Sequence, residues 1–287
     1  MKKKYLISFA SPDLKRSADR YYKQAKSLDF YDEIFVFSVS DLEKESQDKI
    51  LKLLKENKKN GYGYWFWKPL ILKQLLKKIR ERDIIHYTDV GCHLNPSGLK
   101  RLNYYIEKLQ NTEKGLLAFQ YNPLKDYNYE DFEFPNIAEY IYTKADLFDY
   151  FDVLKKKEIT NTNQFWAGNI LLEKNRFTEN FVNKWIDVFD KRFDLVDDTS
   201  SKISNFKNFL HNKHDQSVYS LLCKLNEIES LSAYECEWFY HKGIRYWKHT
   251  EKSPVIAKRD KKYNIFQRFL NRQKKTVKRY YNKFFGE

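Results

Sequence analysis

The sequence predicts an α/β protein in which a mostly parallel sheet is covered by helices on both faces. Three observations lead to this prediction. Short apolar runs alternate along the chain with longer segments whose apolar residues recur at helical spacing. Hydrophobic residues make up 42% of the 287 residues and aromatic residues 17%, which is enough to form a sizeable core. No internal repeat and no Pro/Gly-rich linker precede residue 257, which favours one large domain.

The first elements follow the order strand, helix, strand, helix. The apolar run at 4–10 (KYLISFA) ends at Ser-Pro-Asp and predicts a buried strand. Residues 16–28 carry apolar side chains at helical spacing. The run at 33–39 (EIFVFSV) predicts a second strand, and Ser40-Asp41 can cap a helix that runs towards Lys55.

The middle of the chain continues this alternation. After a loop at 57–63, Pro69 suits the first turn of a helix that extends to Ile79. The run at 83–88 (DIIHYT) predicts a third strand, directly before Asp89. The remaining expected elements are a helix at 97–109, a strand at 115–120, a helix at 137–151, a strand at 165–172 (FWAGNILL), and helices at 176–189 and 215–225. Such alternation is typical of a parallel sheet between two helical layers.

The last thirty residues differ from the rest of the chain. Residues 258–287 hold eleven Lys or Arg and two acids, so +9 of the net charge of +14 lies there. Their apolar side chains recur at three, four or seven residues, which predicts a basic amphipathic helix. We therefore divide the chain into a domain at 1–257 and a tail at 258–287. The tail suits an anionic membrane surface, where each basic residue contributes on the order of 1 kcal/mol, or packing onto the first domain or a partner subunit.

The compartment follows from the cysteines and the apolar runs. The three cysteines form no CxxC pair, which argues against a disulfide framework or a thiolate zinc site and fits a reducing compartment. The apolar run between Met1 and Phe9 is too short for a signal-peptide core, and no apolar stretch reaches about 18 residues. The expected location is the cytoplasm or a membrane surface.

Two segments near predicted strand ends are the first candidates for a site. In an open α/β sheet, ligands bind beyond the carboxyl ends of the strands. Asp89 lies at such an end, two residues before Gly91, although a turn or capping role would also explain it. In the segment 61–69 (GYGYWFWKP), Lys68 could meet a phosphate. Trp65 and Trp67 cannot both face one side of a helix, so we expect at least one to line a cleft.

Two further segments carry polar groups. Asp215 opens a predicted helix within His-Asp-Gln-Ser (214–217), where it serves as a cap or as a site residue. Gln164 and Trp166 precede Gly168, a small residue that permits close approach of a ligand or of another backbone segment.

Together these segments resemble the small bacterial glycosyltransferases of polysaccharide gene clusters, which have the GT-A nucleotide-sugar fold. The residues that carry the resemblance are 61–69 (GYGYWFWKP), 87–92 (YTDVGC), 164–172 (QFWAGNILL) and 214–217 (HDQS), in that order. They span about the middle half of the chain. The N-terminal SFASPD loop is compatible with the same fold.

The resemblance implies an enzyme that moves a sugar, expected to be a hexose, from a nucleoside-diphosphate donor to a hydroxyl. UDP is favoured because that donor is common among GT-A folds. The expected acceptor is a growing capsule, lipopolysaccharide or other cell-surface glycan, lipid-linked or free. The enzyme would lie on the inner face of the cytoplasmic membrane, attached through its basic tail.

The resemblance also assigns roles to single residues. Asp89 becomes the first aspartate of a DxD-like motif that binds Mn²⁺ or Mg²⁺ against the donor diphosphate, but Gly91 replaces the second carboxylate. His249 or His241 is the expected additional metal ligand, with His249 preferred. Residues expected to hold the donor are Ser11, Asp13, Trp65, Trp67, Lys68, Asp89, Trp166 and Gly168. Those expected at the reacting centre are Asp215, as base or orienting group, Gln216 and Gln164.

Two other classes of function compete with this interpretation. A pI of 9.3 and many aromatic residues suit a nucleic-acid-binding protein, although the basic residues concentrate in the tail. A metal-dependent nuclease could use Asp89 and Asp215 to hold ions, but that reading leaves the Trp-rich segment unexplained.

Overall fold

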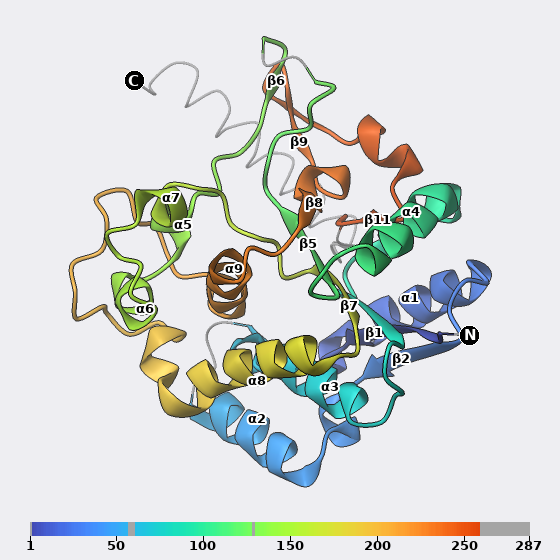
Figure 1. Ribbon diagram of the computed structural model, residues 1–287, viewed down its shortest axis with the longest axis horizontal. Helices are drawn as coiled ribbons and strands as arrows, with labels where there is room; N and C mark the ends of the chain where they lie inside the picture. Colours follow the sequence, from blue (N-terminus) through green and yellow to red (C-terminus); the bar gives the residue numbers. More distant parts are fainter. Residues whose placement is uncertain (1, 57–60, 128–129, 259–287) are drawn as a thin grey trace, which may run out of the picture.

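The structure is a computed structural model that describes residues 2–56, 61–127 and 130–258. A six-stranded sheet in the order β2-β1-β3-β7-β5-β8 forms its centre (Figure 1). Its strands are β1 (Lys4–Phe9), β2 (Glu33–Phe37), β3 (Ile84–Thr88), β5 (Leu116–Gln120), β7 (Asn169–Glu173) and β8 (Ser230–Ser232). The fold is therefore the α/β class that the sequence predicts.

Strand direction places the carboxyl ends at one edge of the sheet. Strand β1 is parallel to β2 and β3, and β5 is parallel to β8. Strand β7 is antiparallel to both of its neighbours, β3 and β5. The sheet is thus mostly parallel, and the amino end of β7 lies at the same edge as the carboxyl ends of β3 and β5.

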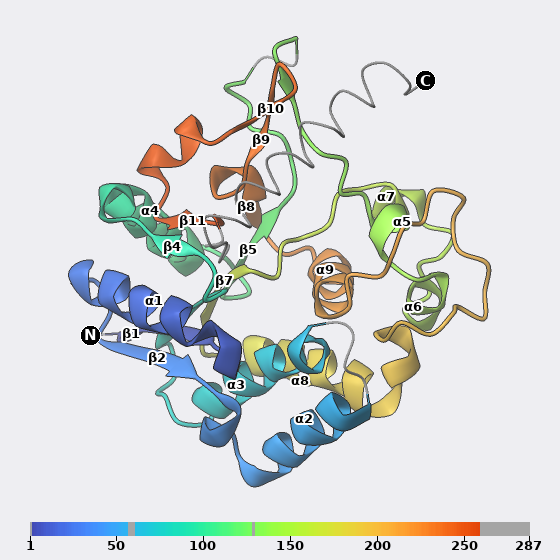
Figure 2. The same ribbon diagram turned by 180° about the vertical axis from the view of Figure 1, so that it is seen from behind.

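Helices cover both faces of the sheet (Figures 1 and 2). Helices α2 (Lys44–Glu56), α3 (Trp67–Leu76), α8 (Arg176–Lys191) and α9 (Asp215–Leu225) contribute to one hydrophobic core. Helices α1 (Lys15–Ser27) and α4 (Leu99–Gln110) contribute to the core on the other face. Adjacent residues of a strand face different cores. Leu6 packs into the core with α1 and α4, and Ile7 packs into the core on the other face.

Shorter elements complete the described part of the chain. The short helices are α5 (Glu139–Tyr142), α6 (Ala145–Tyr150) and α7 (Lys157–Thr160). Strands β6 (Phe132–Glu133), β9 (Phe239–His241) and β10 (Ile244–Tyr246) form a small sheet, and β4 (His93–Leu94) pairs with β11 (Val255–Ile256). Turns of 3-10 helix lie at Pro12–Leu14, Val39–Asp41, Tyr62–Trp65, Pro96–Gly98, Phe193–Leu195, Ala233–Glu235 and Lys248–Lys252.

The structure confirms five of the predicted strands and most of the predicted helices, and it corrects two elements. The helix expected at 137–151 is two helices, because Thr143 and Lys144 have extended backbone between them. The strand expected at 165–172 begins only at Asn169, because the residues before it turn. Residues 259–287, where the sequence predicts a basic amphipathic helix, lie outside the described residues, so this helix and the division at 257 stay predictions. Among the described helices, none combines the length and apolar character needed to cross a bilayer.

Candidate active site

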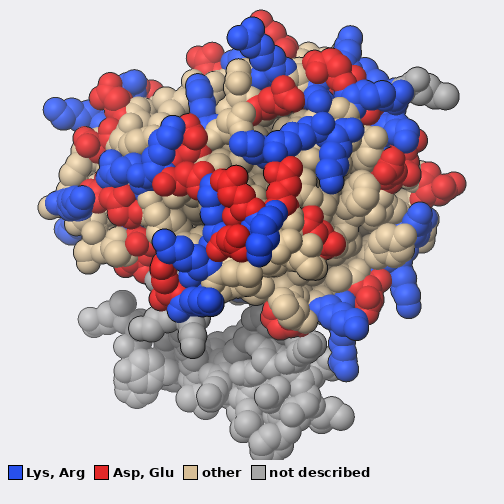
Figure 3. Space-filling model, turned by 90° about the horizontal axis from the view of Figure 1, so that it is seen from below, with Lys and Arg blue, Asp and Glu red and all other residues tan. Residues whose placement is uncertain are grey.

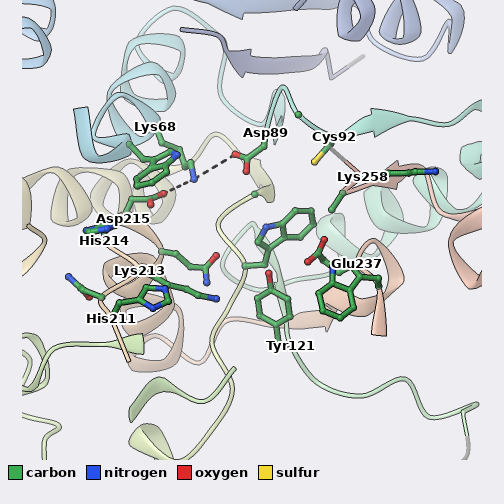
Figure 4. Close-up of a pocket in the computed structure, with 18 of the residues that line it drawn as sticks. Lys68, Asp89, Cys92, Tyr121, His211, Lys213, His214, Asp215, Glu237 and Lys258 are labelled. Carbon is green, nitrogen blue, oxygen red and sulfur yellow. Dashed lines mark hydrogen bonds and ion pairs between the residues drawn. The ribbon is translucent and has the colours of Figure 1, made fainter. Parts of the chain in front are cut away.

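The four segments that carry the resemblance meet at one cavity of about 950 Å³. This cavity lies at the edge of the sheet where β3 and β5 end and β7 begins. Because β7 is antiparallel to β3, the residues after β3 and those before β7 are neighbours in space. Figure 4 shows the site, and the segments line it with Trp65, Lys68, Asp89, Gly91, Cys92, Trp166, Gly168, His214, Asp215 and Gln216.

A charged cluster occupies one side of the cavity. The ammonium Nζ of Lys68 lies 2.6 Å from Oδ2 of Asp215 and 3.8 Å from Oδ1 of Asp89. The side chains of Lys68 and Asp215 are 4% and 6% exposed, whereas that of Asp89 is 24% exposed. Burial raises the pKa of Asp215, and the nearby Lys68 opposes this rise without cancelling it. The cluster therefore holds two carboxylates around one cation, with Asp89 the carboxylate nearest to solvent.

Lys68 lines the cavity, as the sequence predicts, and two carboxylates surround its ammonium group. Its contact with a donor phosphate stays a prediction. Its position is fixed by these carboxylates, and its charge is compensated by them. Asp89 is fixed in turn by Tyr87, whose hydroxyl donates a 2.6 Å hydrogen bond to Oδ1.

Gly168 is needed for the packing of an indole ring. A Cβ at residue 168 would lie 2.3 Å from Nε1 of Trp166. The backbone of Gly168 also accepts a 3.0 Å hydrogen bond from the amide of Asp89. The group that approaches Gly168 closely is therefore the indole ring of Trp166, which lines the cavity. Gly168 thus contacts both Trp166 and the backbone of Asp89.

Gly168→Ala is expected to displace the Trp166 indole and to lower the free energy of unfolding by about 1–3 kcal/mol, because the new methyl group overlaps the ring. Urea unfolding and tryptophan fluorescence measure both effects. In a Trp166→Ala background the same substitution should cost much less, since the overlapping ring is gone. An equal cost in both backgrounds would show that Trp166 is not the obstacle.

Three residues beside the cavity have left-handed backbone although none is glycine. They are Tyr64 (φ 51°), Trp65 (φ 58°) and His214 (φ 51°). The rings are in contact: His214 stacks on Trp65 with centroids 5.6 Å apart and meets Tyr64 edge to face at 5.2 Å. Such conformations cost about 1–3 kcal/mol each and concentrate at functional sites. No residue pattern indicates this strain, and the sequence singles out His214 only as part of the segment 214–217.

Gln164 has a positioning role. It is completely buried and is not among the residues that line the cavity. Its Oε1 accepts a 2.8 Å hydrogen bond from Nε2 of Gln216, and its own Nε2 donates to Oε2 of Glu139 at 3.0 Å. Gln216 does line the cavity. The expectation that Gln164 acts directly at the reacting centre is therefore replaced by one in which it holds Gln216.

Two expected site residues lie away from the cavity. Trp67 is 6% exposed, stacks on Phe9 with centroids 4.2 Å apart, and donates from Nε1 to the carbonyl oxygen of Tyr62. It belongs to the core, so only Trp65 of the pair lines the cavity. Nε2 of His249 lies 2.8 Å from the carbonyl oxygens of Tyr234 and Glu237, and His249 does not line the cavity.

Ser11, one of the residues expected to hold the donor, lies at a second cavity of about 580 Å³. It lies where β1 and β2 end, beside the first turns of α1, and Ser11 and Tyr22 line it. The hydroxyl of Ser11 donates a 2.5 Å hydrogen bond to Oδ1 of Asp13. Asp13 therefore orients Ser11 and lines neither of these two cavities.

The sequence predicts a divalent-cation site formed by Asp89 with His249 or His241. Asp89 offers a carboxylate to the cavity, but Nε2 of His249 is directed at backbone carbonyls, and His241 stacks on Phe132 in the small sheet. Within 2–56, 61–127 and 130–258, no three or more His, Cys, Asp or Glu side chains form a group that could hold a metal ion. These residues do not fit a cation held by the protein.

The other side of the cavity comes from residues that the sequence did not single out. They are Tyr121 after β5, His211 and Lys213 before α9, and Glu237, Trp238, Arg245 and Trp247 around the small sheet. Their segments are polar or irregular, so no periodic pattern marked them.

Comparisons with known proteins complete the description. No family model matches the chain, and no curated protein matches it. Among solved structures, it is similar to a glycosyltransferase involved in glycosylation of the major capsid of PBCV-1, with a TM-score of 0.46, 10% identity and coverage of 95% of this chain and 99% of that one. It is also similar to the glycosyltransferase GlyE of Streptococcus pneumoniae TIGR4, with a TM-score of 0.42, 14% identity and coverage of 81% and 46%. The similarity to mouse xyloside xylosyltransferase 1 has a TM-score of 0.42 and 11% identity, and it covers 82% of this chain and 87% of that one.

Proposed function

We propose that this protein is a glycosyltransferase that uses a nucleoside-diphosphate sugar. One observation carries the proposal: the four segments that resemble glycosyltransferase motifs, separated by up to about 150 residues, line the same cavity at the carboxyl edge of the sheet. Ligands of open α/β sheets bind at this edge. The cavity offers aromatic walls and carboxylates, which suit a sugar with its many hydroxyl groups.

In this proposal the donor occupies both cavities. The nucleoside occupies the second cavity, where Tyr22 presents a 43% exposed ring for stacking and Ser11 a buried hydroxyl. The transferred sugar lies in the main cavity beside Asp89 and Trp166. Arg20 of α1 joins the two regions, because its guanidinium donates to the carbonyl oxygens of Val90 and Cys92 in the loop that follows Asp89.

The charged cluster supplies the acid–base chemistry. The acceptor hydroxyl oxygen forms a bond to the anomeric carbon, the bond from that carbon to the donor diphosphate breaks, and the hydroxyl proton passes to a carboxylate of the cluster. Asp215 keeps Lys68 between the two carboxylates, and Asp89 faces the growing positive charge of the sugar ring. Gln216, held by Gln164, orients the reacting groups.

The finer parts of the proposal come from the sequence. The donor is a UDP-hexose, and the acceptor belongs to a bacterial cell-surface glycan such as capsule or lipopolysaccharide. The basic tail at 258–287 attaches the enzyme to the inner face of the cytoplasmic membrane, where anionic lipids attract its eleven basic residues.

The face shown in Figure 3 is less suited to the nucleic-acid alternative. On the face shown in Figure 3, Lys and Arg side chains alternate with Asp and Glu, whereas nucleic-acid binding uses a surface of one sign. The nuclease alternative requires bound metal ions, and the described residues supply no group to hold them.

A nucleotide panel tests the proposal. UDP, GDP, CDP and dTDP are added at about a hundred times their dissociation constants, with Mn²⁺ or with a chelator, and melting is recorded. One of them should raise the melting temperature by about 5 °C, which corresponds to about 2.7 kcal/mol for a chain of this size. Its sugar conjugate should then release the nucleoside diphosphate. Binding of single-stranded oligonucleotides with no response to any nucleotide would contradict the proposal.

A further inference from the structure

Lys213 lines the main cavity, and no charged side chain of the described residues is in contact with its ammonium group. Its ammonium lies 4.2 Å from the ring centroid of Tyr142 and 5.7 Å from that of Tyr121. Among the described residues, this ammonium forms neither a hydrogen bond nor an ion pair with a carboxylate, in contrast to the doubly paired Lys68. A partly buried cation that faces a cavity and lies against aromatic rings is well placed to meet an anion from outside.

Lys213 carries this charge at neutral pH. Burial lowers its pKa to about 8, and the carboxylates of Glu237 and Glu139 limit the drop. The ammonium form therefore predominates at pH 7, although its burial is unfavourable for the free protein. An anion that enters the cavity would remove this unfavourable term.

The surroundings of Lys213 suit a sugar that carries the anion. In Figure 4 Lys213 and Tyr121 lie in the lower part of the view and Lys68 and Asp89 in the upper part, with Glu237 at the right. Trp238 and Trp247 line the same cavity, and the guanidinium of Arg245 lies 4.0 Å from the Trp238 ring centroid. Indole rings stack on the faces of sugars, and Arg245 supplies a second cation without an ion pair among the described residues.

We propose that Lys213 and Arg245, with the ring of Trp238, form an acceptor subsite that selects a sugar bearing a phosphate or a carboxylate. The inference deepens the proposed function, on which it rests, because it names the class of acceptor. In the proposed function the donor diphosphate lies between the second cavity and the sugar beside Asp89, so the two anions are expected to bind together and not to compete.

Calorimetry with matched sugars tests the subsite. Methyl glucoside, methyl glucuronide and glucose 6-phosphate are titrated into the full-length protein with and without saturating UDP. At least one anionic sugar should bind about tenfold or more tightly than methyl glucoside. The anionic sugar that binds more tightly then shows whether the subsite prefers a phosphate or a carboxylate. Equal affinity for all three would overturn the proposal. So would displacement of UDP by glucose 6-phosphate, since Lys213 would then belong to the donor diphosphate.

Variants connect this preference to the residue. Lys213→Met should reduce the preference to less than about threefold and should not lower the melting temperature, because it removes a buried charge. Lys252→Met, which changes an exposed lysine outside the cavity, should leave the preference intact. A preference that survives in Lys213→Met would overturn the proposal. If no nucleotide binds but the anionic preference depends on Lys213, the proposed function fails and the subsite stands.

Discussion

Asp89→Asn is expected to lower the rate of sugar transfer by about a hundredfold or more with little change in melting temperature. The substitution removes the charge of the most exposed carboxylate in the cluster, and loss of one preorganised electrostatic group at a reacting centre typically costs 10²–10³ in rate. The fold should survive, because an amide oxygen can still accept the hydrogen bond from Tyr87 and Lys68 keeps Asp215 as its partner.

The rate is measured as release of the nucleoside diphosphate at saturating donor. Asp187→Asn is the matched control, because Asp187 lies on α8 and pairs with Lys191 at the surface. This control should retain the wild-type rate. A wild-type rate in Asp89→Asn would remove Asp89 from the mechanism and would leave the cluster with a structural role.

Lys68→Met is expected to lower the free energy of unfolding by about 3–5 kcal/mol, because it leaves Asp215 buried without its cation. Urea unfolding measures the loss. In the double variant Lys68→Met/Asp215→Asn much of the stability should return, since no uncompensated charge remains in the core.

The same variant has a defined pH dependence. Burial already raises the pKa of Asp215 above its ordinary value of 3.8, and removal of Lys68 raises it further. A carboxyl with a raised pKa stabilises the folded state most at low pH and loses this contribution as pH rises through the folded-state pKa. Lys68→Met should therefore be less destabilised at pH 5 than at pH 8. Lys191→Met, at an exposed ion pair, should cost about 0.5 kcal/mol or less.

The fold was predictable because its central strands carry apolar residues on both faces. Strands such as Ile84–Thr88 are buried throughout, so a continuous apolar run identifies them. The short strands at 230–246 are only partly buried, so their sequence has no continuous apolar run and predicts a loop. The reversal of β7 was not predictable from its own residues, because a strand buried on both faces reads alike in either direction.

The site was predictable where a polar residue interrupts an apolar pattern. Asp89 follows a buried strand and Asp215 begins a helix, and both line the cavity. The sequence could not separate Trp65 from Trp67, because left-handed backbone at Tyr64 and Trp65 decides which ring faces the cavity. It also missed Lys213, since a lysine in a polar stretch reads as solvated, whereas contact with Tyr142 places it inside.

A crystal structure with the nucleoside diphosphate selected by the panel would show directly whether the main cavity is the donor site. We predict that the nucleoside lies near Ser11 and Tyr22, with the diphosphate directed towards Asp89, the loop after β3 and Trp166. The four segments at 61–69, 87–92, 164–172 and 214–217 would then surround the sugar end of the ligand. A nucleotide bound elsewhere, with this cavity empty, would contradict the assignment of the site and the function proposed for it.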